Sequence, residues 1–317
     1  MRPTRRQFVA SAAGVGAATL AGCTSGSTDT TQTRTNETEP ADEAAVSRAQ
    51  TSFFVFYDAA LAVAGDTLSV EYLIPFGQHG HGWSPDASVR ADIREADVLV
   101  HGPENFQPWI DDILVDLSDT TTINIASDVE LLDAGPLPKR TYDPHFWMDP
   151  IRMQTAVETV QQRLAEVDPD NATTYEENAQ ARQDQLQTLH EDLTALTDRA
   201  NNEVLLHAGH NAFRYLAGRY GFDVFALTGV SPDDRPTTEV IQEASQLIQE
   251  HDLSYVCADP IEKQFGAQQL VAETDAQEVL DLTAMPGVID TWQKNDWGYL
   301  EIMRNVNMPT LERALDA

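Results

Sequence analysis

The sequence contains little cysteine and little lysine. Among its 317 residues are two cysteines, Cys23 and Cys257, and only three lysines, although 51 residues are acidic and 20 are basic. The acidic residues are spread over the whole length, so the chain offers no basic surface for nucleic acid phosphates. Diffuse acidity with so few lysines is typical of proteins from concentrated salt, where the Debye length falls to about 3 Å at 1 M. The composition therefore excludes nucleic acid as a partner and indicates a salt-loving source.

An apolar stretch near the N-terminus is short for a membrane-spanning helix. It lies in TRRQFVASAAGVGAATLAGC, where paired arginines precede small apolar residues that end at Cys23. A spanning helix needs about 20 apolar residues, and fewer follow the arginines. The pattern resembles a twin-arginine export signal with a lipobox, which implies cleavage before Cys23 and lipid attachment to its sulfur. An ordinary membrane anchor is the alternative, and both place the body of the protein outside the cytoplasmic membrane.

Large apolar side chains are almost absent from residues 24–49. This segment, TSGSTDTTQTRTNETEPADEAAVSRA, is predicted to be a flexible tether. With lipid on Cys23, Cys257 has no partner in the mature chain, so no disulfide is expected. We therefore divide the N-terminal part into an export signal, residues 1–23, and a tether, residues 24–49.

Beyond the tether, short apolar runs alternate with amphipathic stretches in two separate regions. The runs predict strands in the first region in TSFFVFY, LSVEYLI, DVLVHG and TTINIA, and in the second in EVLLHAG, FDVFALTG, LSYVCAD and AQEVLDL. Alternating strands and helices joined by short turns indicate mostly parallel sheets with helices on both faces. The sequence therefore predicts two α/β lobes, residues 50–168 and 201–317.

The region between the lobes is predicted to be helical. From residue 150 to about residue 200 the helical pattern is interrupted only at DPDN. Its second part runs for about 28 residues, which corresponds to roughly 42 Å. Its apolar residues form one narrow stripe of Tyr175, Leu186, Leu189, Leu193 and Leu196. We expect residues 169–200 to form a long helix that lies along both lobes and links them.

The stretch TYDPHFWMDP places His145 in a loop stiffened by proline. Asp143 and Asp149 flank this histidine and could bond its ring nitrogens or nearby backbone amides. Alone, His145 is compatible with a metal ligand or with a structural histidine.

Several other metal-binding side chains follow predicted strands. Ligand sites in open α/β sheets lie at the carboxyl ends of the strands. The side chains found there are His79, His81, His145, His210, Asp259 and Asp281. Three imidazoles and a carboxylate would make a tetrahedral set suited to a divalent transition metal, zinc above all. His101 also follows a strand and is either a loop histidine or a hydrogen-bond partner of a ligand.

Five segments carry a resemblance to a known family. GQHGHGWSPDAS, ADVLVHGPENFQPW, DPHFWMDP, HNAFRYLAGRYG and the LDL near Asp281 resemble signature segments of the metal-specific solute-binding proteins of zinc and manganese ABC importers. They occur in the order of that family, called cluster A-I or cluster 9, and the resemblance, of a haloarchaeal type, covers the chain from about residue 50. It implies metal ligation by His81, His145, His210 and Asp281.

The chain departs from the family pattern in ways that bear on the metal. HGH replaces the usual D-P-H, which places His79 where aspartate is common and offers it as an accessory ligand. The histidine-rich loop of many zinc members is missing, because residues 128–140 contain no histidine. Manganese members usually carry glutamate at the position of His210, so histidine there favours zinc. Asp259 is expected to hold an imidazole N–H of a ligand.

The resemblance implies a monomeric, lipid-anchored protein that captures Zn²⁺, or alternatively Mn²⁺, between two lobes and delivers it to an ABC permease. Four protein ligands leave no position for an activated water, so the site is predicted to be a binding site and not that of an enzyme. Protons compete with the metal for neutral imidazoles, so affinity should fall below about pH 6. The long helix should restrict hinge closure, so that metal binding orders loops instead.

Two other functions remain as alternatives. A binding protein for a metal chelate such as haem or a corrinoid would share the plan of lobe, helix and lobe, but needs one axial ligand and a wide apolar cleft. A secreted zinc hydrolase needs three ligands, an open position and a general base. The sequence has no H-E-x-x-H or comparable helical pair.

Overall fold

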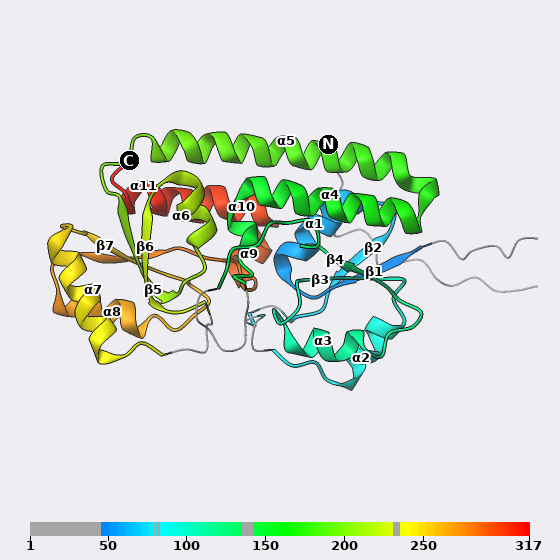
Figure 1. Cartoon of the computed structure of the whole chain (residues 1–317), viewed down its shortest axis with the longest axis horizontal. Helices are drawn as coiled ribbons and strands as arrows, with labels where there is room; N and C mark the ends of the chain where they lie inside the picture. Colours follow the sequence, from blue (N-terminus) through cyan, green and yellow to red (C-terminus); the bar gives the residue numbers. More distant parts are fainter. Residues whose placement is uncertain (1–45, 76, 79, 81–82, 135–141, 231–234) are drawn as a thin grey trace, which may run out of the picture. The chain divides into compact units, whose positions relative to one another are not determined.

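The structure is a computed structural model that describes residues 46–75, 77–78, 80, 83–134, 142–230 and 235–317. It contains two four-stranded parallel sheets, one in each half of the chain (Figure 1). This arrangement confirms the predicted pair of α/β lobes.

The first sheet has the strand order β2-β1-β3-β4. Its strands are β1 (Arg48–Thr51), β2 (Ser69–Tyr72), β3 (Val98–His101) and β4 (Thr121–Asn124). The helices of this lobe are α1 (Phe54–Ala64), α2 (Ala87–Arg94) and α3 (Pro108–Leu114). All four residues of β3 are buried, as expected for a central parallel strand covered on both faces.

The second sheet has the equivalent order β6-β5-β7-β8. Its strands are β5 (Val204–His210), β6 (Asp223–Thr228), β7 (Tyr255–Ala258) and β8 (Glu278–Asp281). The accompanying helices are α6 (Arg214–Tyr220), α7 (Thr238–Glu250) and α8 (Phe265–Glu273). In both lobes, the first strand of the lobe lies inside the sheet, and the strand order reverses beside it. Ligand sites in such sheets lie at this point, outside the carboxyl ends of the strands.

The predicted strand TSFFVFY is wrong. β1 ends at Thr51, and Phe54 already begins α1, whose residues are buried on several sides. A short apolar run does not distinguish a buried strand from a buried helix, which explains the error. β1 begins at Arg48, inside the predicted tether. Every other predicted strand overlaps an observed one.

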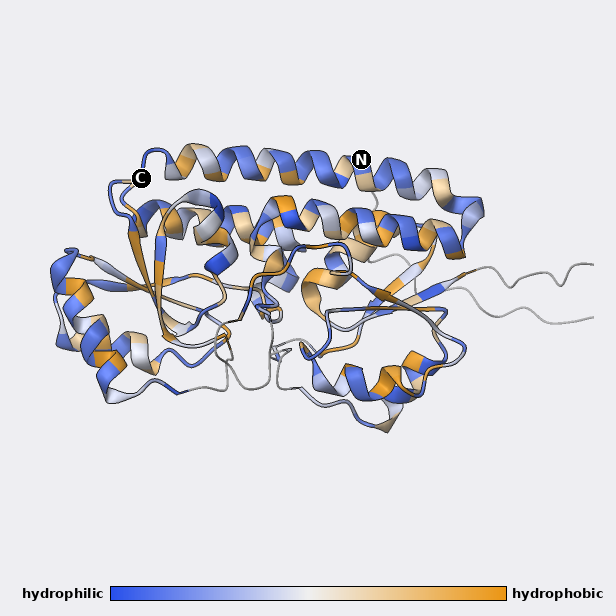
Figure 2. Ribbon diagram, in the orientation of Figure 1, coloured by the Kyte–Doolittle hydropathy of each residue, from blue (hydrophilic) through white to orange (hydrophobic). Residues whose placement is uncertain are grey.

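The long linking helix is present as α5 (Ala172–Thr197), 26 residues or about 39 Å. It follows α4 (Pro150–Val167) and the short turn η2 (Pro169–Asn171). α5 packs against α1 and α4 and also against α6, α10 and α11, so it contacts elements of both halves (Figure 1). Its buried face carries the predicted stripe, while Figure 2 shows hydrophilic residues along the rest of its surface. Among the described residues, no helix combines the length and apolar composition needed to cross a membrane.

The chain ends in helices that return to α5. They are α9 (Asp290–Lys294), α10 (Tyr299–Ile302), the π-helical turn η3 (Met303–Asn307) and α11 (Met308–Ala314). The final helical segment therefore contains a π-helical turn.

One hydrophobic core runs through both lobes. Its buried members include Phe56 and Trp147 from the first half of the chain and Phe213 and Tyr299 from the second. The Trp147 indole N–H donates to the Ala284 carbonyl at 2.9 Å, and the Tyr299 hydroxyl donates to the Trp147 carbonyl at 2.7 Å. Trp147 therefore fixes the loop after β4 to elements of the second lobe.

Candidate metal centre

The loop that carries His145 is built by its neighbouring aspartates. The Asp143 carboxylate oxygen Oδ1 accepts hydrogen bonds from the His145 backbone N–H at 3.0 Å and from its ring Nδ1 at 2.7 Å. Both side chains are fully buried. Immediately after His145 comes the turn η1 (Phe146–Met148), and Asp149 then caps α4 by accepting from the Ile151 N–H at 3.0 Å. The prediction that these aspartates bond ring nitrogens or local amides is confirmed.

The Asp143 carboxylate is ionised in spite of its burial. Burial alone would raise the pKa of this group, but hydrogen bonds from the ring and backbone of His145 and the nearby Arg214 guanidinium outweigh it and lower the pKa. An ionised Asp143 holds the proton of His145 on Nδ1 and leaves the lone pair of Nε2 for another partner.

His210 lies at the carboxyl end of β5 and meets His145 from the other lobe. The two Nε2 atoms are 3.3 Å apart. On the other side of its ring, the Nδ1 atom of His210 lies 3.0 Å from Oε1 of Glu262. Each imidazole therefore has a carboxylate near Nδ1, hydrogen-bonded for His145 and at ion-pair distance for His210, and directs Nε2 toward the other ring.

The spacing of the two Nε2 atoms matches two corners of a tetrahedral zinc site. Nitrogens bound about 2.0–2.1 Å from zinc at tetrahedral angles are about 3.3–3.4 Å apart. Two Nε2 lone pairs that face each other at this distance repel unless a cation lies between them. The pair is therefore arranged to share a metal ion or a proton.

Other predicted site residues lie in different surroundings. Asp281, at the end of β8, is exposed, and its Oδ1 lies 3.3 Å from the Gln264 amide nitrogen. Asp259 is buried, and its Oδ2 accepts from the Thr283 hydroxyl at 2.8 Å and the Ala284 N–H at 3.1 Å. Asp259 thus holds the loop after β8 against the end of β7.

His101 is the last residue of β3 and is buried. Its Nδ1 lies 2.7 Å from the Gly102 carbonyl oxygen, and burial lowers the pKa of the ring. Burial keeps the imidazole neutral, and the contact with the carbonyl oxygen fixes the ring to its own backbone.

His79 and His81 lie outside the described residues, but Gly80 between them is described. The Gly80 N–H donates to the Pro286 carbonyl at 2.8 Å, across the lobes. A side chain at Gly80 would meet the Phe53 ring, since a Cβ there would lie 2.7 Å from its carbons. Within the described part of the chain, no three His, Cys, Asp or Glu side chains are grouped so that they could hold a metal. The structure therefore brings together His145 and His210, but not Asp281 with them.

His207 and Glu262 are the residues near this centre that the sequence did not assign to it. His207 is fully buried, and burial, together with the nearby His210, lowers the pKa of its ring to about 4. A Cβ at Gly209 would lie 2.7 Å from Cε1 of His207 and 3.2 Å from Oε2 of Glu262. Glu262 follows β7 by four positions, so its place at the same edge of the sheet as His210 was a signal available in the sequence.

A cavity of about 1300 Å³ lies beside the His145–His210 pair, on the side of the second lobe. Its walls include His210 and Glu262 together with Trp83, Arg235 and Lys263. The cavity gives an ion or water access to His210, whereas His145 is fully buried.

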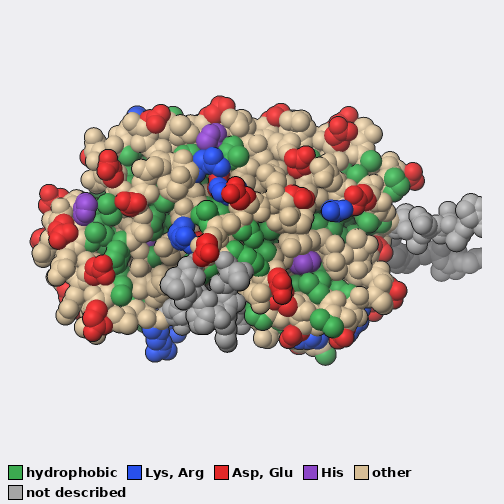
Figure 3. Space-filling view, in the orientation of Figure 1, with side chains coloured by type: hydrophobic (Ala, Val, Ile, Leu, Met, Phe, Trp, Pro, Cys, Tyr) green, Lys and Arg blue, Asp and Glu red, His purple; other side chains and the backbone are tan. Residues whose placement is uncertain are grey.

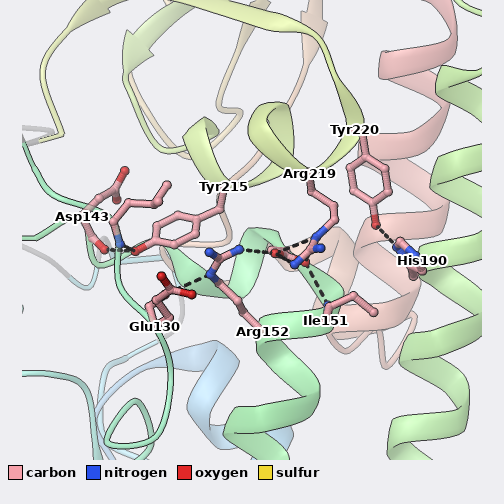
Figure 4. A network of polar contacts seen from close by, with 10 residues as sticks. Glu130, Asp143, Ile151, Arg152, His190, Tyr215, Arg219 and Tyr220 are labelled. Carbon is pink, nitrogen blue, oxygen red and sulfur yellow. Dashed lines mark hydrogen bonds and ion pairs between the residues drawn. The ribbon is translucent and has the colours of Figure 1, made fainter.

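A polar network ties the His145 loop to α6, the helix that follows His210 (Figure 4). The Tyr215 hydroxyl donates to the Asp143 carbonyl at 2.6 Å. The Arg219 guanidinium donates to Oδ2 of Asp149 at 2.7 Å, and Arg152 donates to the same oxygen at 2.5 Å. These contacts fix the two imidazoles relative to each other through their supporting segments.

At the far end of this network, the His190 ring is half-buried, and its Nδ1 lies 3.1 Å from the Tyr220 hydroxyl (Figure 4).

Known proteins resemble this chain in sequence. The zinc-binding lipoprotein AdcA of Streptococcus pneumoniae is 28% identical over 283 residues, which cover 84% of this chain and 55% of AdcA. The chain thus spans about half the length of this relative. The high-affinity zinc uptake system protein ZnuA of Bacillus subtilis is 24% identical over 278 residues, covering 84% of this chain and 86% of that protein.

Solved structures share the fold. The Zn(II)-bound ZnuA-like domain of S. pneumoniae AdcA matches with a TM-score of 0.74 and 29% identity, covering 86% of this chain and all of that domain. The metal-dependent lipoprotein YcdH of B. subtilis matches with a TM-score of 0.73 and 26% identity, covering 85% of this chain and 99% of YcdH.

The family model described as "zinc-uptake complex component A, periplasmic" matches residues 50–314. This range contains both lobes, the linking helix and the His145–His210 pair. The chain therefore belongs to the ZnuA family, whose members bind a substrate for transport and are not enzymes.

Proposed function

We propose that this protein captures Zn²⁺ outside the cytoplasmic membrane and delivers it to an ABC permease. The observation that carries the proposal is the 3.3 Å separation of the His145 and His210 Nε2 atoms, each on a ring with a carboxylate at Nδ1. Neutral imidazoles held in this way are good ligands for zinc. The membership of the ZnuA family and the zinc-bound AdcA domain with the same fold support the same metal.

The rest of the ligand set is part of the proposal. We assign the third imidazole to His81, with His79 as an accessory ligand, because Gly80 between them is bonded to the opposite lobe. The family resemblance supplies Asp281 as the fourth ligand. Asp259 and His101 have supporting roles, Asp259 through its bonds to the loop at Thr283 and Ala284.

Mn²⁺ is the alternative cargo. Carboxylate-rich sites favour manganese and imidazole-rich sites favour zinc, and the two ligands that the structure brings together are both imidazoles. A chelate such as haem or a corrinoid is a weaker alternative, because two facing imidazoles at 3.3 Å leave no room for a macrocycle between them.

The location of the protein is also proposed. The twin-arginine pattern at Arg5 and Arg6 and the cysteine at position 23 support export and lipid attachment to Cys23. The excess of acidic residues, scattered over the face shown in Figure 3, supports a haloarchaeal type of protein that acts as a monomer in concentrated salt.

Metal analysis of residues 46–317 in molar salt tests the function, with His145→Ala as the variant and His251→Ala, on an exposed histidine at the end of α7, as its control. We expect one equivalent of zinc in the parent protein and the control, retained against excess manganese, and loss of binding by at least 100-fold in His145→Ala. One equivalent of manganese would overturn the choice of metal. No metal above background in the parent protein would overturn the function.

A further inference from the structure

We infer that Tyr215 is a positioning residue for the metal centre: its hydroxyl clamps the His145 loop to α6 and so holds the His145 imidazole opposite His210. The inference rests on the proposed function of the site and names the residue that sets the spacing of its two imidazoles. Tyr215 acts through the backbone and side chain of Asp143 and is not itself a ligand.

The Tyr215 hydroxyl is buried where two backbone segments of the first lobe meet. It donates to the Asp143 carbonyl at 2.6 Å and accepts from the Leu132 N–H at 2.8 Å (Figure 4). The same two segments are joined to each other, because the Asp143 N–H donates to the Leu132 carbonyl at 2.8 Å. One hydroxyl from the second lobe therefore holds both segments of the first lobe.

The Asp143 side chain carries this restraint to the imidazole of His145. Its Oδ1 accepts from the His145 backbone N–H at 3.0 Å and lies 2.7 Å from Nδ1 of the ring. Both side chains are fully buried, so the ring has no free space into which it could turn. A shift of the Asp143 backbone therefore moves the His145 ring with it.

The same face of α6 also holds the far end of the loop. Arg219 comes four residues after Tyr215 and therefore lies beside it on the helix surface. Its guanidinium donates to Oδ2 of Asp149 at 2.7 Å and to Oδ1 at 3.1 Å. Asp143 and Asp149 lie on either side of His145 in the chain, so α6 holds this loop at two points.

The connection from α6 back to His210 is short and packed. The helix begins at Arg214, and in the segment before it the Ala212 N–H donates to the His210 carbonyl at 2.9 Å. Ala212 and Phe213 are fully buried. The 3.3 Å separation of the two Nε2 atoms is therefore set through α6, with Tyr215 as the contact closest in the chain to both histidines. Metal ligands bind well when supporting residues hold them in this way near their final geometry.

The test is the zinc affinity of Tyr215→Phe, which removes the hydroxyl and keeps the ring in the core. Tyr175→Phe is the matched control, because the Tyr175 hydroxyl is also buried and donates to Oδ2 of Asp168 at 2.6 Å, at the turn between α4 and α5. Residues that orient metal ligands from outside the coordination sphere contribute about 10–100-fold to metal affinity. We expect Tyr215→Phe to weaken zinc binding about 10-fold, at the lower end of this range, because it acts through Asp143. Tyr175→Phe should leave the affinity unchanged.

Cobalt(II) substitution distinguishes positioning from a loss of stability. We expect the d–d absorption of bound cobalt to shift and broaden in Tyr215→Phe, because the two imidazoles no longer approach the ion at one fixed spacing. Tyr175→Phe should give the spectrum of the parent protein. Lower stability alone does not change this spectrum, because only folded protein binds the ion.

Deuterium exchange of the Leu132 N–H in the metal-free protein measures the clamp without any metal. This N–H donates to the Tyr215 hydroxyl, so its exchange should be slow in the parent protein and in Tyr175→Phe, and fast in Tyr215→Phe. If Tyr215→Phe does not fold, Arg219→Gln provides the zinc and cobalt measurements instead. The Arg219 side chain is 32% exposed, and Arg152 still pairs with Asp149 in that variant.

Several results would overturn the inference. These are an unchanged zinc affinity or the parental cobalt spectrum in Tyr215→Phe, an equal loss of affinity in Tyr175→Phe, or fast exchange of the Leu132 N–H in the parent protein. Failure of the proposed function is distinguishable, because a parent protein that binds no zinc would still show slow exchange of the Leu132 N–H.

Discussion

Replacement of Asp149 should destabilise the protein more than the loss of a helix cap alone. Its fully buried carboxylate caps α4 through the Ile151 N–H and also binds the guanidinium groups of Arg152 and Arg219. Arg219 belongs to α6, the helix after His210, so this carboxylate joins the supporting segments of the His145 and His210 imidazoles.

The expected magnitude follows from these contacts. Breaking a buried ion pair on one side costs about 3–5 kcal/mol, and the 20% and 32% exposure of the Arg152 and Arg219 side chains places this case at about 3, because both can be rehydrated. Loss of an N-cap adds about 1 kcal/mol. We therefore expect Asp149→Ala to lower the free energy of unfolding by about 4 kcal/mol, and Asp149→Asn, which keeps a capping oxygen, by about 3 kcal/mol.

Denaturant unfolding in molar salt measures these differences, and Asp86→Ala provides the matched control. Asp86 caps α2 by accepting from the Ser88 and Val89 N–H groups, and it is exposed. Its replacement removes a helix cap alone and should destabilise the protein much less than Asp149→Ala. If Asp149→Ala were no more destabilising than Asp86→Ala, the two arginines would contribute nothing and the proposed coupling of the two segments would be refuted.

Two further predictions concern stability. The ring of His207 has a pKa of about 4 in the folded protein, below the ordinary value of 6.5. Between these pH values the unfolded chain binds more protons than the folded protein. The metal-free protein should therefore lose stability as the pH falls from 6.5 to 4. In His207→Leu, the loss of unfolding free energy between pH 6.5 and pH 4 should be smaller by roughly 3 kcal/mol. Urea unfolding at several pH values measures this loss, and an unchanged pH dependence would contradict the role given to His207. Arg182 of α5 pairs with Asp58 of α1 in a largely buried site, so Arg182→Met should cost about 3 kcal/mol in unfolding experiments, and adding Asp58→Leu should recover part of it. Equal losses in the single and double variants would show that burial of the lone carboxylate is not the cause.

Most strands and the two lobes were predictable from the sequence because strands and helices alternate with different periodicities, whereas no strand order within the sheets was predicted. The run Phe53–Phe56 was wrongly predicted as part of a strand, because a helix buried on several sides shows no periodicity of apolar residues. His145 and His210 could be placed at strand ends, but their 3.3 Å approach depends on two lobes meeting, which no local pattern encodes.

Glu262 was missed for a related reason. Its side chain reaches the His210 ring because the turn at Asp259 follows β7, the strand that pairs with β5. In sequence it is one of 51 acidic residues, and only its position four residues after β7 sets it apart from the solvated ones.

The backbone bonds between the lobes bear on how the cargo can leave. Gly77 and Gly80 donate to the carbonyls of Val288 and Pro286, and each such bond contributes about 1 kcal/mol net. Separating the lobes would instead expose side chains such as Trp147, Phe213 and Tyr299, each worth about 1.5–3 kcal/mol of buried apolar surface. Breaking these two backbone bonds therefore costs less free energy than separating the two lobes. The empty and filled forms should therefore differ mainly around residues 286–288, while the two halves stay packed together.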